Sequence, residues 1–349
     1  MKIASAVIAV VFSVVAALLS SGTAAEQLTA TSAAQTSPAV TEPAFVPLTA
    51  AVTVAEADNI VLPEMTVTAT GRAETDYSVF STTTATKTDA PIMQTPVSIQ
   101  VVPKAVIEDQ KATRIKDALE NVSGVRPNSS LGSGNRFIVR GFADGGKLYR
   151  NGLLATSPSG FRTEFDTATP ESIEVLKGPA AVLFGRIEPG GLINITATRP
   201  LDTPYYSLEQ RFGSYDFYRT EWDATGPLTR DKSLLYRFDG AYQDSESFRD
   251  FNFIERLVLH PSLTWRPTAS TEMTVEVESL HHDFRPDFGI PVIGRQPAPV
   301  PISRSYGDPN VPEANNDKIL VGFNLSHQFN RSWKLENRFL ASFLETFDT

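Results

Sequence analysis

The stretch "EVLKGPAAVLFGRIEPGGLINITATRP", residues 174–200, decides the fold of this chain. Gly178 and Pro179, and later Gly190 and Gly191, separate three apolar runs. A nucleotide-binding loop would need G-x-G-x-x-G or a Gly-Lys-Ser/Thr ending in front of a helix, and neither is present. The last run alternates β-branched residues with a period of two, which is typical of a strand. The glycines are therefore predicted to be turn residues between short strands.

The composition excludes several classes of protein. The chain has 349 residues, no cysteine and a net charge of −9. The lack of cysteine rules out thiolate metal sites, disulfide frameworks and cysteine nucleophiles. An acidic chain without a basic run does not suit nucleic-acid binding. No nucleophile elbow, zinc signature or carboxylate pair can be placed, so we expect no catalytic residue, no cofactor and no metal site.

Residues 1–25 are predicted to be a signal peptide. Lys2 precedes an uncharged apolar run from Ile3 to Leu19, and small residues follow up to Ala25. A single transmembrane anchor is the alternative, but the run is short for a span and its small-residue exit favours cleavage after Ala25. The mature chain is thus expected to be exported.

Residues 26–79 are predicted to form a flexible leash. The segment is rich in Ala, Thr, Val, Pro and Ser, and no basic residue lies between Lys2 and Arg72. It offers too little apolar surface to offset the entropy of ordering the backbone. Near its end, "PEMTVTAT" (63–70) alternates polar and apolar residues. Such a lone strand can add to the sheet edge of another protein, or it can be an ordinary strand or unstructured.

An α+β domain is predicted for residues 80–200. "SIQVV" (98–102) reads as a strand, and Pro103 can open a helical turn. Ile115, Ala118, Leu119 and Val122 have helical spacing, and Gly124 supplies the stop. Short strands joined by glycine turns follow, in "RFIVRGF", "KLYRNGLL" and "ESIEVLKG".

Residues 201–349 are predicted to form antiparallel membrane-spanning strands. Segments of about ten residues carry an aromatic or aliphatic face opposite a charged face, as strands do between lipid and a polar interior. Turns such as "RPTAST" and "FNRS" are short, whereas "DSESFRDFNFIE" and residues 283–317 read as long loops. Aromatic residues also gather at strand ends, where membrane interfaces lie. These two features favour a membrane barrel over the alternative, a soluble sandwich.

Together these segments resemble the TonB-dependent outer-membrane receptors, specifically their ferric-siderophore branch. The specific motifs are "IVRGF", "IEVLKGP.AVLFG...PGGLINI..RP" and "GSYDFYRTEWDATGPL". The resemblance implies a plug domain (80–200) inside a large barrel, with the leash in the periplasm of a Gram-negative bacterium and long loops outside. It also implies a TonB box, the segment that pairs with the energising protein TonB: Glu64, Met65, Thr66, Val67, Thr68 and Ala69.

The resemblance also assigns roles to residues of the plug. It implies that Arg140 and Lys177 latch the plug to glutamates of the barrel, the alternative being solvated charge. It places siderophore contacts in outward loops, for which we choose Ser130, Gly146, Lys147 and Phe161, the alternative being ordinary loop packing. Iron is expected only as a bound siderophore chelate, because the four histidines form no ligand set.

The function implied is uptake of a ferric siderophore. A receptor for haem, cobalamin or an oligosaccharide is the alternative within the family, and a surface-signalling transducer is the alternative of another class. A transducer would need a further domain before the TonB box. About seven strands fit after the plug, whereas plugged transporter barrels close with about 22, so the sequence is expected to be the N-terminal part of a longer protein.

Overall fold

The structure, a computed structural model, describes residues 77–128, 135–143, 148–155, 164–179, 181–185, 187–308, 310 and 313–347. All of them belong to one unit of the chain, Ala69–Thr349. The predicted signal peptide and TonB box, and the leash up to residue 76, lie outside the described residues. Within the described ranges, no helix is both long and apolar enough to span a membrane.

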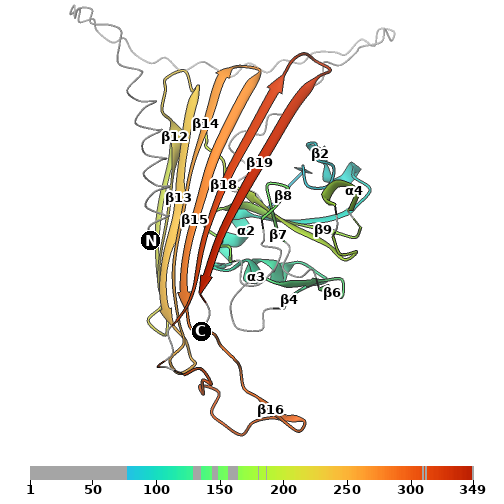
Figure 1. Ribbon diagram of the computed structural model, residues 1–349. Helices are drawn as coiled ribbons and strands as arrows, with labels where there is room; N and C mark the ends of the chain where they lie inside the picture. The colour runs from blue at the N-terminus through green and yellow to red at the C-terminus, as the bar shows by residue number, and fades with distance from the viewer. Residues whose placement is uncertain are drawn as a thin grey trace, which may run out of the picture. The chain divides into compact units, whose positions relative to one another are not determined.

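A mixed five-stranded sheet forms the centre of the plug (Figure 1). Its order is β3 (Ser98–Pro103), β9 (Pro170–Lys177), β10 (Gly191–Ala197), β7 (Leu148–Arg150) and β8 (Leu153–Leu154). Only β7 and β10 run parallel; the other neighbours are antiparallel. Smaller sheets pair β1 (Ser81–Thr82) with β2 (Ala90–Pro91), and β4 (Val125–Pro127) with β5 (Phe137–Val139) and β6 (Phe142–Ala143). The predicted α+β fold is confirmed.

Short helices close the core of the plug. They are η1 (Ile92–Gln94), α2 (Lys104–Asp109), α3 (Ile115–Ala118), η2 (Leu119–Asn121) and α4 (Ala181–Phe184). The predicted apolar stripe of Ile115, Ala118, Leu119 and Val122 is buried at 2% exposure or less. It packs with residues of the central sheet such as Ile173 and Ile193. Gly124 ends the helical stretch with a φ of 75°, as expected for a helix stop.

One strand prediction within the opening stretch is wrong. The middle apolar run forms the helical turn α4 rather than a strand. The reason is topological: β9 already pairs with β3 on one side and β10 on the other. The run between β9 and β10 therefore has no free edge of either strand to join, and Pro179 and Gly185 bracket it as a helical turn.

The glycines of "PGG" allow two backbone segments to approach closely. A Cβ on Gly190 would lie 2.1 Å from the carbonyl oxygen of Val139, and one on Gly191 would lie 2.1 Å from that of Leu176. Gly191 also has a φ of 135°, a conformation that L side chains rarely adopt. The turn-residue interpretation is confirmed for this pair, and close packing is the physical reason.

We expect Gly191→Ala to lower the free energy of unfolding by at least about 2 kcal/mol, because the new methyl group meets backbone and the φ is strained. Chemical unfolding of the protein in detergent measures this. Gly141→Ala is the matched control, since its φ is 85° but a Cβ there has nothing within 4 Å. Equal losses for both variants would contradict the close-packing explanation.

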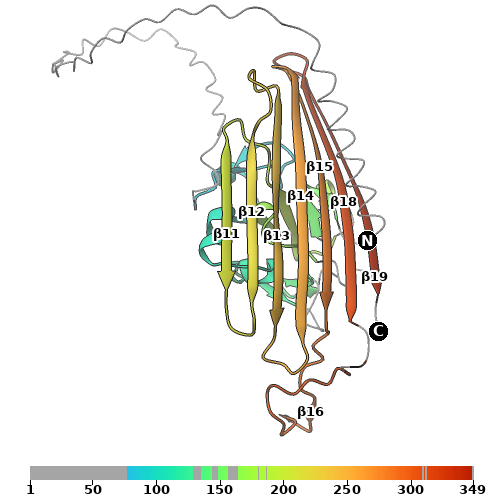
Figure 2. The same ribbon diagram turned by 90° about the vertical axis from the view of Figure 1, so that its left-hand side faces the viewer.

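Seven long strands form one antiparallel sheet in chain order (Figure 2). They are β11 (Tyr205–Phe212), β12 (Tyr218–Pro227), β13 (Leu234–Glu246), β14 (Phe253–Thr268), β15 (Thr271–Phe284), β18 (Ala314–Gln328) and β19 (Lys334–Phe347). The sheet has the expected number of strands. Within the described residues it is open, with β11 and β19 at its edges.

The two faces of this sheet differ as the sequence predicted. Apolar residues such as Leu208, Phe339 and Phe343 are exposed on the outer face. Charged residues such as Arg237 and Arg256 are buried on the opposite face, which lies against the plug (Figure 1). We call this plug-facing side of the sheet the wall.

The predicted loop asymmetry is only partly correct. The stretch "DSESFRDFNFIE" is not a long loop, because β13 and β14 pair as far as Glu246 and Phe253. The connection there is residues 247–252, no longer than the turn 228–233 at the other end of the sheet. Only 285–313, which carries the hairpin of β16 (Val292–Ile293) and β17 (Gln296–Pro297), is long. We call its end of the sheet the long-loop end.

Candidate functional site

The plug contacts the wall mainly through buried charged and polar side chains. The alternation of β12 to β18 turns the wall residues toward the plug, and the plug presents charges of its own. The apolar core of the plug, by contrast, is built almost wholly from plug residues, with Leu320 as its one fully buried wall member among the residues described. A small apolar cluster of the wall, Ala241, Val258 and Leu280, also packs with Ala168 of the plug, so the interface combines charged pairs with a minor apolar patch.

Asp166 of the plug is clamped by two arginines of the wall. Arg219 donates two hydrogen bonds to its carboxylate, at 2.6 and 3.0 Å, and Nε of Arg256 lies 3.1 Å from Oδ2. All three side chains are at most 1% exposed. Burial alone would raise the pKa of Asp166, but Arg219 and Arg256 outweigh it and lower that pKa from 3.8 to about 2. The plug carboxylate is therefore ionised at neutral pH.

Arg150 of the plug enters a second cluster. Its guanidinium lies 2.7 Å from Glu278 and 3.7 Å from Glu276, both on β15. Lys318 of β18 lies 2.9 Å from the other oxygen of Glu278. The neighbouring Asn151 donates to Glu276 at 2.7 Å. The C-terminal end of strand β7 in the plug thus binds two carboxylates of the wall, those of Glu276 and Glu278.

His260 links this cluster to β13. Its Nδ1 lies 3.0 Å from Asp239 and its Nε2 lies 3.1 Å from Glu276, and the ring is fully buried. Both ring nitrogens face carboxylate oxygens, so only the doubly protonated imidazolium can donate to both. Thr198 of the plug donates to the second oxygen of Asp239 at 3.0 Å. His260 is therefore a bridging cation of the wall rather than a metal ligand.

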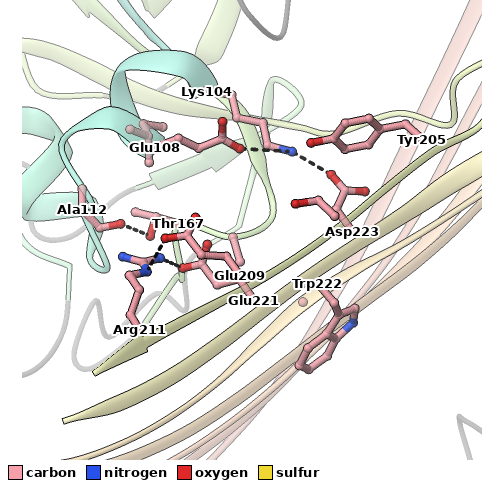
Figure 3. A pocket seen from close by; sticks show the side chains of 14 residues that line it. Lys104, Glu108, Ala112, Thr167, Tyr205, Glu209, Arg211, Glu221, Trp222 and Asp223 are labelled. Carbon is pink, nitrogen blue, oxygen red and sulfur yellow. Dashed lines mark hydrogen bonds and ion pairs between the residues drawn. The ribbon is translucent and has the colours of Figure 1, made fainter. Parts of the chain in front are cut away.

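A third contact lies at the N-terminus of α2 (Figure 3). Nζ of Lys104 donates to Asp223 of β12 at 2.8 Å, and Arg237 of β13 donates to the same carboxylate at 2.6 Å. Figure 3 shows Trp222 pointing away from these groups, on the other side of the strand. A cavity of about 40 Å³ lies beside Lys104, so this edge of the interface can hold water.

The predicted latch residues lie together, on a part of the plug away from these clusters. Arg140 is exposed with a φ of 50°, and Lys177 donates to Gln100 at 2.9 Å and to Ser123 at 3.1 Å. Partial burial and the neighbouring Arg140 lower the pKa of Lys177. No carboxylate pairs with either side chain in the part of the chain that the structure describes. The latch to barrel glutamates stays a prediction.

The other predicted site residues lie outside the described residues. These are Glu64, Met65, Thr66, Val67, Thr68 and Ala69 of the TonB box, and Ser130, Gly146, Lys147 and Phe161 of the plug loops. Two described residues flank the loops, Asn135 and Glu164, and Asn135 donates to the Glu164 carboxylate at 2.9 Å. Phe165, beside Glu164, is buried under the ammonium of Lys318, 3.4 Å from its ring centre.

Sequence reasoning missed the residues that seat the plug: Lys104, Arg150 and Asp166. A partial signal existed, because the strand alternation places cations and acids of both signs on the inner face. Three neighbouring strands of the wall carry an inward arginine, namely Arg219, Arg237 and Arg256. Buried arginines need acidic partners, so acidic residues are expected opposite them. The alternation does not tell which plug residues supply them.

The comparisons with known proteins now identify the fold. Residues 91–192 match the family description TonB-dependent Receptor Plug Domain. The chain is 35% identical over 278 residues to the metal-pseudopaline receptor CntO of Pseudomonas aeruginosa, covering 78% of this chain and 39% of the relative. This chain belongs to the TonB-dependent receptors. The plug and the first antiparallel strands described above are parts of that architecture.

Further relatives of this TonB-dependent receptor are also receptors. The ferrioxamine B receptor of Salmonella typhimurium is 30% identical, over 73% of this chain and 38% of the relative. The solved structure of the pyoverdine outer membrane receptor FpvA from Pseudomonas aeruginosa, bound to pyoverdine, superposes with a TM-score of 0.72 at 25% identity. It covers 77% of this chain and 40% of FpvA. The chain thus spans about two fifths of the length of these relatives.

Proposed function

We propose that this chain is part of an outer-membrane receptor that binds a ferric siderophore and imports it with energy delivered by TonB. The observation that carries the proposal is a plug domain seated by buried charges against strands whose outer face is apolar. The names of the relatives support the ligand class, since ferrioxamine, ferrichrome and pyoverdine receptors are among them. In this proposal the leash lies in the periplasm and the long-loop end lies outside the cell.

The polar interface suits a plug that has to move. Separating two charged groups in a dry interface costs much free energy, because each is left without a partner. Water that enters the interface between plug and wall can solvate both groups and lower that free energy. Displacement along the wall exposes the charged pairs, which water can hydrate, together with small apolar patches at Leu320 and around Ala168. We infer that the plug is held firmly at rest and can be drawn aside when TonB pulls the leash.

The receptor performs no chemistry on its cargo in this proposal. Iron arrives already wrapped in its chelator, and the protein supplies recognition, a path and coupling to TonB. The residues that the structure describes contain no group of three or more His, Cys, Asp or Glu side chains that could hold a metal ion. We propose neither a resident cofactor nor an enzymatic activity.

Equilibrium titration of the purified receptor in detergent tests the ligand class. The probes are ferrioxamine B, ferrichrome, a ferric catecholate, metal-loaded pseudopaline, haem and cobalamin, followed by tryptophan fluorescence. We expect saturable binding of at least one ferric siderophore at micromolar or lower concentration. Binding confined to haem or cobalamin would reassign the ligand, and a lack of TonB dependence in whole-cell uptake would contradict the mechanism.

A further inference from the structure

A row of polar side chains crosses five strands of the wall near the long-loop end. In register, Arg219 pairs with Gln243, Gln243 with Arg256, Arg256 with His282, and His282 with Asn316. All five are at most 4% exposed. The row is thus a continuous, buried polar band.

Within the described structure, the plug residue Asp166 pairs only with side chains in the first half of this band, Arg219 and Arg256. Gln243 accepts hydrogen bonds from both arginines at 3.1 Å. In the second half, neither ring nitrogen of His282 and neither polar atom of the Asn316 amide has a hydrogen-bond partner within the described structure.

Four unpartnered buried atoms on two adjacent side chains are unusual. Native proteins satisfy the great majority of such groups, and leaving them unsatisfied costs free energy. The His282 ring is nevertheless held in place, stacked on Phe284 with ring centres 4.7 Å apart. A fixed and unsatisfied polar pair of this kind is suited to receive a group that is absent from the resting arrangement.

The surroundings point to the ligand path. The long connection 285–313 begins three residues after His282 and ends three residues before Asn316. Lys318, on the same strand as Asn316, donates to the backbone oxygen of Glu164 at 2.5 Å. In the sequence, Asn135 follows the segment with Ser130 and Glu164 follows the segment with Phe161, two of the predicted ligand contacts, and Asn135 donates to Glu164. The wall strand that carries Asn316 therefore contacts the plug at Glu164.

The geometry points to His282 and Asn316 as a subsite for an anionic oxygen group of the ferric chelate, such as a carboxylate, hydroxamate or catecholate oxygen. Both side chains can donate a hydrogen bond. Arg256, next to His282 in register, places a guanidinium on the same face of the wall, where it can add a charge-assisted contact to a bound oxygen. Since both residues are 1% exposed, the chelate reaches them through a local shift of Glu164 from the wall on binding, while the rest of the plug stays seated until TonB acts. This inference rests on the proposed function.

Apolar substitution separates a ligand subsite from a structural role. His282→Leu and Asn316→Leu remove the unsatisfied groups at similar volume, so a subsite should lose function without losing stability. We expect each variant to bind the best ferric siderophore of the panel at least about tenfold more weakly. The midpoint of chemical unfolding should stay the same or rise.

Ser262→Ala is the matched control. The Ser262 hydroxyl is also buried and unpartnered, but it lies six residues along β14 from Arg256, about 20 Å away toward the other end of the sheet. Its removal should leave binding unchanged. Wild-type affinity in both leucine variants would overturn the subsite, and a lower unfolding midpoint with unchanged affinity would assign the two residues to structure through bridging water. Failure of the wild-type protein to bind any ferric siderophore would overturn the proposed function itself.

Discussion

Asp166→Ala is expected to lower the free energy of unfolding by about 3–5 kcal/mol, the loss typical when one partner of a buried ion pair is removed. The variant leaves Arg219 and Arg256 buried without their shared carboxylate. Chemical unfolding of the receptor in detergent measures the change. The control is Asp202→Ala, which breaks an exposed contact with Lys232 at 3.9 Å and should cost at most about 1 kcal/mol. Similar losses in both variants would show that the clamp on Asp166 does not seat the plug.

The lowered pKa of Asp166 predicts that the free energy of unfolding decreases at acid pH. Because the folded pKa of Asp166 is about 2 and its ordinary value is 3.8, the ionised group stabilises the folded state fully above pH 3.8. That contribution is lost as the pH falls through the folded value. The difference in unfolding free energy between wild type and Asp166→Asn should therefore be constant above about pH 4 and shrink between about pH 4 and 2. A difference independent of pH would mean that the pKa is not depressed.

Val67→Pro is expected to abolish siderophore uptake while leaving binding at the cell surface intact. Under the proposed mechanism, Glu64 to Ala69 pair by backbone with an edge strand of TonB, and proline removes a strand donor. Uptake of labelled iron by whole cells and equilibrium binding are measured side by side. The control Ala51→Pro places the same substitution in the leash, which already contains prolines. If both uptake and binding are lost equally in the Val67 variant, the segment is not a TonB box.

The sequence was most informative where structure follows from local periodicity. Period-two alternation predicted the seven strands and their two faces, because one face of each strand meets lipid or solvent and the other is buried. Helical spacing predicted the stripe at Ile115 and Ala118. The glycine pair at 190 and 191 was predicted as a turn, and the close approach of Val139 and Leu176 explains why glycine is needed there.

Prediction failed where structure depends on distant partners. The α4 turn is helical because both edges of β9 are occupied, and strand pairing cannot be read from a local pattern. The plug-seating pairs join residues far apart, as Lys104 and Asp223 are separated by 119 positions. The latch of Arg140 and Lys177 stays a prediction, and the sequence did not point to Arg150 and Asp166, which meet the described wall. Charge sign and burial were predictable for the wall, but the identity of the partner was not.

The ion pairs that seat the plug also constrain how the protein is assembled. Asp223, Arg219, Arg256, Glu278 and Lys318 all lie on the strands that directly follow the plug in the chain. As synthesis proceeds from the N-terminus, these partners emerge immediately after the plug and before any later segment. Among the described residues, the charge pairing that seats the plug is thus complete within strands β12 to β18, so it needs no contact from β19 or beyond.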